Sequence, residues 1–374
     1  MGPLTGTRVL ELEAIGPVPF CAMVLGDLGA DVIRIDRPGG SGDPLRTLMG
    51  RNRRSIAVDL KHPEGPEVVM RLVERADVLV EGMRPGVAER LGVGPTVCLE
   101  RNPRLVYGRM TGWGREGPYA HQAGHDLDYI AVAGALHAIG DPGLPPPPPL
   151  NLVADFGGGA MFLALGVLAA LIERVGSGRG QVVDAAMVDG VSALLTMFHE
   201  MRARGMWYDE RGANLLDGGA PFYATYRTAD DRYVAVAALE PKFYAELVAG
   251  LGLVDEDLPG QHDRESWGRM RRVFAGRFAE RALDDWMVVF AGGDACVFPV
   301  VAMSEAPEQP HLAVRRVFVD VDGVLQPAPA PRFSRSAPAA PTSAPLPGRD
   351  TEELLREMGY DDNEIRDLRR RRVI

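Results

Sequence analysis

The 374-residue chain has only three cysteines, and their placement excludes two kinds of framework. Cys21, Cys98 and Cys296 are widely spaced and odd in number, and no CxxC pair or Cys/His cluster occurs in the sequence. Disulfide scaffolds are rich in cysteines that occur in even numbers, and structural zinc sites need closely spaced Cys or His ligands. We therefore expect a reducing compartment, a cytoplasmic location and no metal site.

Positive charge is also in short supply. The chain carries 41 Lys and Arg against 51 Asp and Glu, a formal net charge of −10. Binding to nucleic-acid phosphates is driven by clustered positive charge, so we expect no nucleic-acid partner. Two nucleotide signatures are missing as well, because the first apolar run leads into EAIGPVP rather than GxGxxG and no GxxxxGK[ST] occurs. Neither a nicotinamide cofactor nor a P-loop nucleotide is expected.

Long apolar runs are scarce. The N-terminus lacks the basic and then apolar regions of a secretory signal, and the final RRVI is not a peroxisomal address of the SKL type. The longest uncharged run, residues 156–172, has 17 residues and opens with three glycines. A membrane span needs about 20 apolar residues. The run therefore predicts a buried core helix and no membrane partner.

Short apolar runs alternate with helix-like segments in the first third of the chain. This alternation predicts an α/β fold, with a Rossmann-like large domain built on a parallel sheet. Further helices are expected at 125–138, 158–174 and 184–204, which would complete a large domain over residues 1–204. The expected strands are 8–13, 31–36, 55–60, 77–82 and 105–112, with helices at 17–28 and 63–75 between them.

The pattern changes near residue 217 and predicts a smaller α/β domain over residues 217–320. Two β-rich runs, YATYRT and RYVAVAAL, are joined by the turn-forming ADD. Helical stretches follow at 242–252, 265–279 and 283–290 before an apolar run at 296–303. Residues 327–374 are expected to form a Pro/Ala/Ser-rich surface linker and two short helices that return to the large domain.

Basic residues cluster between Arg34 and Lys61. An anionic ligand is one interpretation, because arginine suits bidentate phosphate contacts and open α/β sheets bind ligands at their strand ends. Arg84 and Arg90 would lie at an equivalent end. A solvated face paired with acids elsewhere is the other interpretation. This segment has a local charge of +4. It contains seven basic residues (Arg34, Arg37, Arg46, Arg51, Arg53, Arg54, Lys61) and three acidic residues (Asp36, Asp43, Asp59).

His125 follows Gly124 at the expected start of a helix. A helix N-terminus disfavours the imidazolium form, so His125 would be available as a neutral base, with Tyr129 on the same helix face. A purely structural histidine is the alternative.

Asp155 precedes a glycine triplet that opens the uncharged helix. Desolvation would raise the pKa of its carboxyl, whereas helix-terminal N–H groups would lower it. Glycines permit close approach of a ligand, and free N–H groups at Gly157–Gly159 would meet a developing oxyanion. An ordinary N-cap aspartate is the alternative. Glu240 ends the predicted strand RYVAVAAL before Pro241, where a charged side chain is usually just solvated.

These motifs together resemble the class III CoA-transferase family. The resemblance is carried in order by LGADVIRIDRP, RNRRSIAVDLK, RPGVAERLG, AGHDLDY, NLVADFGGG and GQVVDAAMVDG, and it runs through essentially the whole chain. The GHD motif together with Glu240 is similar to the racemase branch of that family. Two departures stand out: Asp128 replaces an expected Asn, and TADDRY replaces the commoner TADGRY.

The resemblance implies an interlocked homodimer, with an active site where the large domain of one subunit meets the small domain of the other. It implies His125 and Asp155 as acid/base residues and Glu240 as the acid that pairs with the histidine. It implies no cofactor beyond the CoA of the substrate. The implied CoA-binding positions are Arg37, Val58, Asp59, Leu60, Lys61, Gly82, Met83, Arg84, Arg90, Gly124, Asp126, Leu127, Asp128 and Tyr129.

The reaction implied by the resemblance interconverts (2R)- and (2S)-2-methylacyl-CoA thioesters. Inverting the α-carbon requires proton removal on one face and delivery on the other, hence two titratable groups. Two other functions stay open. A CoA-transferase would use Asp155 as a nucleophile that forms an acyl-aspartyl anhydride. A non-enzymatic acyl-CoA binding protein would keep the basic residues but need no acid/base pair.

Overall fold

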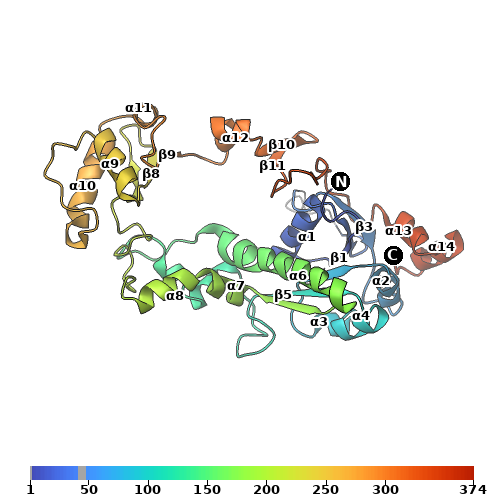
Figure 1. Ribbon diagram of the computed structural model, residues 1–374. Coiled ribbons are helices and arrows are strands. Elements are labelled where there is room, and N and C mark those ends of the chain that lie inside the picture. The colour runs from blue at the N-terminus through green and yellow to red at the C-terminus, as the bar shows by residue number, and fades with distance from the viewer. Residues whose placement is uncertain (1, 41–47) are drawn as a thin grey trace. The chain divides into compact units, whose positions relative to one another are not determined.

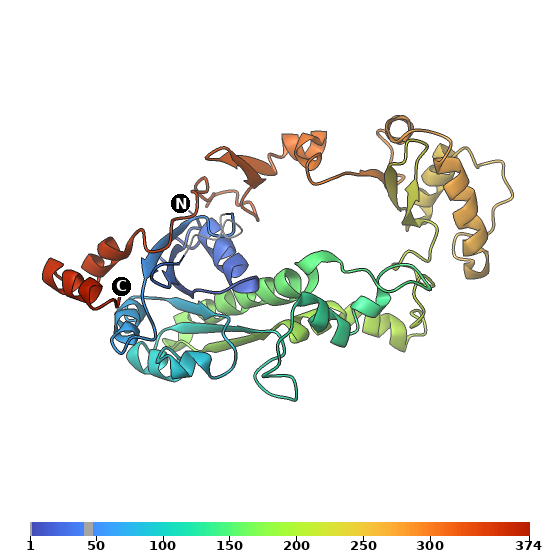
Figure 2. The same ribbon diagram turned by 180° about the vertical axis from the view of Figure 1, so that it is seen from behind.

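The computed structural model describes residues 2–40 and 48–374, which form two compact units (Figures 1 and 2). Unit 1 comprises Met1–Ala133, Leu150–Leu194 and Arg316–Ile374, within the described residues. Unit 2 comprises Gly134–Pro149 and Leu195–Arg315.

Unit 1 is built on a six-stranded parallel sheet in the order β3-β2-β1-β4-β5-β6. The strand order reverses between β1 and β4, the arrangement of Rossmann-like sheets, which bind ligands beyond the carboxyl ends of their strands. The predicted α/β fold with a parallel sheet is confirmed. The strands are β1 (Arg8–Leu12), β2 (Asp31–Asp36), β3 (Arg53–Ala57), β4 (Val78–Glu81), β5 (Val106–Thr111) and β6 (Val182–Ala186).

The sixth strand corrects the helix expected over 184–204. Val182–Ala186 pairs in register with Tyr107–Thr111 of β5, so the strand continues three residues into the expected helix. The two β-branched valines that open β6 favour an extended backbone. Helix α7 (Met187–Leu194) begins only after Ala186, and α8 (Thr196–Ala203) is a separate helix.

The two faces of the sheet are covered by different helices. Alternate strand residues point to opposite faces, and one set packs with α2 (Gly65–Val73), α4 (Pro95–Arg101), α13 (Thr351–Glu357) and α14 (Asp362–Arg370). The opposite face carries α1 (Pro17–Asp27) and α6 (Met161–Ser177), as Figure 1 shows. The short helix α3 (Val87–Arg90) follows β4.

Helix α6 is not the fully buried core helix that its uncharged sequence predicts. Its inner face buries Leu163, Val167 and Ala170, whereas Ile172 and Val175 on the other side are 75% and 86% exposed. Together with the helical turns before it, Leu150–Ser177 is long and apolar enough to cross a membrane by length and composition alone, and 39% of its most apolar window is buried. The prediction failed because the helix is apolar on both sides while the sheet covers only one.

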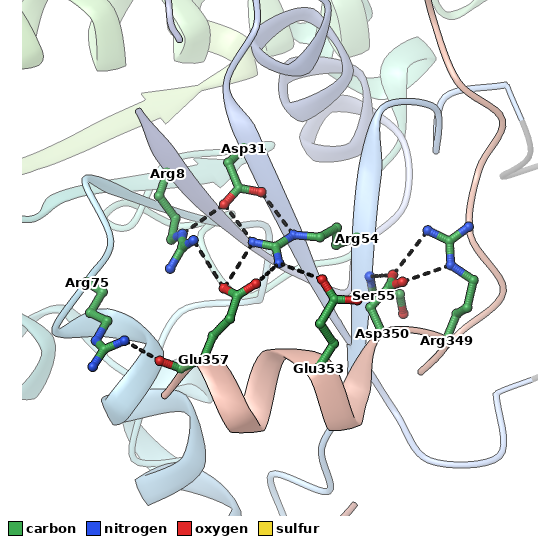
Figure 3. Close-up of polar contacts among 9 residues, drawn as sticks. All are labelled: Arg8, Asp31, Arg54, Ser55, Arg75, Arg349, Asp350, Glu353 and Glu357. Atoms are coloured by element: carbon green, nitrogen blue, oxygen red, sulfur yellow. Dashed lines mark hydrogen bonds and ion pairs between the residues drawn. The ribbon is translucent and has the colours of Figure 1, made fainter. Parts of the chain in front are cut away.

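The C-terminal helices are attached to unit 1 by a group of ion pairs (Figure 3). Glu357 of α13 contacts Arg8 at 3.3 Å and also pairs with Arg54, and both arginines contact Asp31. The Asp350 carboxylate accepts the backbone N–H of Ser55 at 2.8 Å. These contacts hold the end of the chain against the strands β1, β2 and β3.

Unit 2 contains a three-stranded antiparallel sheet in the order β7-β8-β9, with α9, α10 and α11. Aromatic side chains dominate its core, including Tyr226 and Phe278, which stack with centroids 5.1 Å apart. The elements are β7 (Tyr223–Arg227), β8 (Tyr233–Ala237), α9 (Pro241–Gly250), α10 (Trp267–Phe278), α11 (Leu283–Val289) and β9 (Val297–Val300).

Three shorter elements follow unit 2's sheet: α12 (Pro310–Val314) and an antiparallel hairpin of β10 (Phe318–Val321) and β11 (Val324–Pro327). The sequence pattern did not predict this hairpin. Its turn contains Asp322 and Gly323, both with positive φ, which is the turn chemistry that hairpins prefer.

Candidate active site

A cavity of about 580 Å³ in unit 1 brings several predicted residues together. Loops that follow β1, β4 and β5 form its walls, so the cavity lies at the carboxyl ends of parallel strands, where open α/β sheets bind ligands. His125 and Asp155 both line it. The other lining residues named by the sequence analysis are Gly82, Met83, Arg84, Gly124 and Tyr129.

His125 occupies the N-cap of helix α5 (Asp126–Val132), as predicted from the glycine before it. Its backbone is extended, with φ −131° and ψ 174°, and its N–H donates to Asp128 Oδ2 at 2.9 Å. The imidazole is exposed in the single chain. Asp128 therefore holds the histidine's backbone in place.

Tyr129 anchors the loop that carries His125. Its hydroxyl donates to the Gly124 carbonyl, and its ring packs edge-on against Trp113 with centroids 4.7 Å apart. Gly112 leaves room for this ring, because a Cβ at Gly112 would lie 2.1 Å from Tyr129 Cζ. Burial, together with the nearby Asp155 carboxylate, raises the pKa of Tyr129 to about 12, so its hydroxyl stays a hydrogen-bond donor near neutral pH.

Asp155 lies inside a π-helix, Val153–Ala160, rather than at an N-cap. The first backbone N–H groups there, those of Ala154 and Asp155, donate to Asp126 Oδ2 at 2.7 Å each. The glycine N–H groups at Gly157–Gly159 follow the i→i+5 bonding pattern of a π-helix. The expectation that they are free to meet an oxyanion is therefore wrong.

The pKa of the Asp155 carboxyl is raised above its ordinary value, chiefly by burial. A hydrogen bond from Asn151 and the proximity of His125 lower it, whereas the charge of Asp126 raises it. The net effect keeps Asp155 protonated to a higher pH than an exposed aspartate, as suits a group that must both donate and accept a proton.

Asn151 is a site residue that the sequence analysis missed. Its Nδ2 donates to Asp155 Oδ2 at 3.1 Å, and it lines the same cavity. The signal was present in the spacing, because residues four apart on a helix are neighbours. The kinked 3-10 turn at Leu150–Leu152 places Asn151 just ahead of the π-helix.

The remaining predicted CoA positions are scattered around unit 1. Arg37 has a side chain that is 81% exposed, with its Nε 3.6 Å from Glu13 Oε2. Val58 and Asp126 are buried, so their side chains are not offered to a ligand. The N–H of Asp59 donates to the Val373 carbonyl. Leu60 is half-buried, and the other exposed members of this set are Lys61, Arg90, Leu127 and Asp128.

Glu240 belongs to unit 2 and is exposed at the N-cap of α9. It does not end strand β8, which stops at Ala237. Pro241 explains the difference, because proline is favoured in the first helical turn and starts α9 directly after Glu240.

The basic cluster between Arg34 and Lys61 consists largely of internal ion pairs, which corrects its interpretation as one anion-binding surface. Arg53 pairs with Glu11, and the two side chains are 0% and 1% exposed. Arg51 pairs with Asp27 in the same buried setting. The other pairs are Arg34 with Asp36 at 2.9 Å and Arg54 with Asp31 at 2.7 Å, while Arg46 lies outside the described residues.

The sequence matches CoA-transferase family III over residues 4–351. It is 46% identical to the alpha-methylacyl-CoA racemase of Mus musculus and 44% identical to that of Homo sapiens, each over 99% of this chain and 97% of the relative. The crystal structure of a CAIB/BAIF family protein from Brucella suis superimposes with a TM-score of 0.83 at 26% identity, covering 96% of this chain and 99% of that one. The chain belongs to CoA-transferase family III.

Proposed function

We propose that this protein is an alpha-methylacyl-CoA racemase, an isomerase that interconverts (2R)- and (2S)-2-methylacyl-CoA thioesters. The observation that carries the proposal is the pairing of His125 with Asp155 in one cavity, where the pKa of the aspartate is raised. Full-length relatives at 44–46% identity carry this name, which supports it.

In this mechanism the two groups act on opposite faces of the α-carbon. Neutral His125 removes the proton on one face, and protonated Asp155 delivers a proton to the other. The thioester carbonyl becomes an enolate between the two steps. In the reverse direction Asp155 is the base and His125 the acid, so each must be able to hold either protonation state.

The CoA part of the substrate would be bound by cations of unit 1. Arg84 lines the cavity, and Arg37, Lys61 and Arg90 have exposed side chains of a kind that suits phosphate contacts. Binding far from the reacting carbon supplies orientation, which can account for roughly 7–11 kcal/mol of a barrier at best. We propose no cofactor beyond this CoA moiety, and a cytoplasmic location.

We also propose that the enzyme is a homodimer whose second copy covers the exposed side of α6. Leu165, Ile172 and Val175 are 63%, 75% and 86% exposed, an apolar face that soluble monomers seldom leave in water. In the dimer Glu240 of one copy would pair with His125 of the other.

Exchange of the α-hydrogen tests the proposed function. A 2-methylacyl-CoA ester is incubated with the protein in deuterium oxide, without any acceptor acid. Deuterium incorporation with loss of optical activity is expected. A CoA-transferase would give no exchange, and hydroxylamine would instead trap an acyl-aspartyl anhydride at Asp155. Binding of the ester with neither result would mean a non-enzymatic acyl-CoA binding protein.

A further inference from the structure

We propose that Asp126 is a positioning residue, whose carboxylate ties the segment carrying Asp155 to the helix that begins at His125. This inference rests on the proposed racemisation and goes beyond it, because it assigns the group that sets the spacing of the acid/base pair.

The geometry is direct. Asp126 is 4% exposed, and its Oδ2 accepts the backbone N–H groups of both Ala154 and Asp155 at 2.7 Å. Asp126 is also the residue that follows His125 in the chain. One carboxylate oxygen therefore connects the backbone next to one acid/base residue with the backbone of the other.

These two hydrogen bonds are expected to be strong. The first N–H groups of a helix have no acceptor within the helix, and leaving them buried without a partner is costly. A charged acceptor makes bonds about twice as strong as a neutral one. Losing the carboxylate would release the start of the π-helix, and a 1 Å displacement of a catalytic group can cost about 100-fold in rate.

The other oxygen points to a role beyond stability. Asp126 Oδ1 is buried and has no hydrogen-bond partner among the described residues. Leaving one oxygen of a buried carboxylate without a hydrogen bond is costly, and a role in catalysis is one of the reasons for which folded proteins keep such groups. The charge also acts on Asp155, because it adds to the effect of burial in raising the pKa of that carboxyl.

Few other groups among the described residues act on the pKa of Asp155. Asn151 and His125 lower it, and the Asp155 charge in turn raises the pKa of Tyr129. Charged residues on the other elements packed against the π-helix have neighbours elsewhere: Asp27 pairs with Arg51, Arg109 with Glu81 and Arg174 with Asp77, while Asp189 acts on Asp184.

The test compares Asp126→Ala and Asp126→Asn in the full-length protein. Racemisation kcat, KM for a 2-methylacyl-CoA ester and thermal stability are measured for both. Asp126→Ala is expected to lower kcat about 100-fold and change KM less than threefold. Asp126→Asn keeps an acceptor oxygen, so kcat at its pH optimum should recover to within about tenfold of wild type. Its pH limb from Asp155 should move to lower pH, because the nearby negative charge is gone.

Asp350→Asn is the matched control. Asp350 is also a largely buried carboxylate that accepts a backbone N–H, that of Ser55, but it lies among the C-terminal contacts of Figure 3 rather than at the cavity. It should lower stability without changing kcat or the pH profile. Equal kcat and pH profiles in wild type and folded Asp126→Ala would overturn the proposal, as would an Asp126→Asn effect no different from that of Asp350→Asn.

A second readout separates this inference from the proposed function. The pKa of Asp155 is followed by carboxyl carbon NMR in the ligand-free wild type and in Asp126→Asn. A lower pKa in the variant supports the positioning role even if the wild type exchanges no α-hydrogen, in which case only the proposed function fails. An unchanged pKa contradicts the proposed influence of Asp126 whatever the reaction.

Discussion

The carboxylate of Asp155 lies against the backbone of Gly16, so that a Cβ at Gly16 would come 3.4 Å from Asp155 Oδ2. Gly16 has φ +68° and ψ −116°, a conformation that side-chain-bearing residues rarely adopt, and it directly precedes helix α1. The loop after β1 and the π-helix therefore meet at the candidate acid through a residue with no side chain.

Replacing Gly16 by alanine should impair catalysis and stability together. The backbone conformation would cost about 1–3 kcal/mol of unfolding free energy. The new methyl would touch the Asp155 carboxylate at van der Waals distance, and the strained backbone would displace the loop beside it. We therefore expect kcat for racemisation to fall at least about tenfold, measured with denaturant melts alongside. Gly276→Ala is the control, because a Cβ there meets open space within α10. It should leave kcat unchanged and stabilise the fold by about 0.5–1 kcal/mol. Normal activity in Gly16→Ala would contradict the close approach.

The first five strands of unit 1, with helices α1 and α2 between them, could be predicted from sequence because each strand is a short apolar run set off by turns. Strand β6 was missed since its pairing with β5 is a contact between distant parts of the chain, and the residues after it suit a helix. The exposed face of α6 was missed for a related reason: an apolar composition does not tell which side of a helix the sheet covers.

At the site, His125 and Asp155 could be found from local patterns, whereas the role of the arginines could not. A count of charges between Arg34 and Lys61 omits Glu11 and Asp27, which lie outside that window but pair with Arg53 and Arg51 in the fold. Asp126 shows the same limit, because its partners are 28 and 29 residues further along the chain.

The buried pair of Arg53 and Glu11 should matter for stability and not for CoA. Removing one partner leaves an uncompensated buried charge, so Arg53→Ala is expected to cost about 3–5 kcal/mol of unfolding free energy. The KM for the CoA ester should stay within threefold at a temperature where the variant is folded. Arg202→Ala, which breaks an exposed pair with Asp209, should cost at most about 1 kcal/mol. A large rise in KM with little loss of stability would show instead that Arg53 binds the CoA ester.

The exposed side of α6 should behave as an interface. Ile172→Lys places a charge on it without touching the inner face that packs on the sheet. Sedimentation is expected to show a dimer for the wild type and dissociation for the variant. Racemase activity should decrease as the fraction of dimer decreases, because each site would need Glu240 from the second copy. A wild type that sediments as a monomer and is fully active would contradict this arrangement.

The raised pKa of Asp155 predicts a pH-dependent stability cost. Because the folded state holds this proton more tightly than the unfolded chain, the cost is absent well below the ordinary aspartate pKa and grows as pH rises through the raised value. Asp155→Asn removes this cost. The difference in melting temperature, variant minus wild type, should therefore be larger at pH 8 than at pH 4. A difference between the two proteins that does not depend on pH would show that burial does not disfavour the charged form.

The most direct test of the central claim, that His125 and Asp155 act on opposite faces of one carbon, is α-hydrogen exchange followed separately on each enantiomer of a 2-methylacyl-CoA ester. Asp155→Asn should exchange one enantiomer with retention of configuration and leave the other untouched, because His125 still removes and returns a proton on its own face. His125→Gln should show the opposite preference, and neither variant should racemise. Exchange of both enantiomers by either single variant, or the same preference in both, would contradict the account.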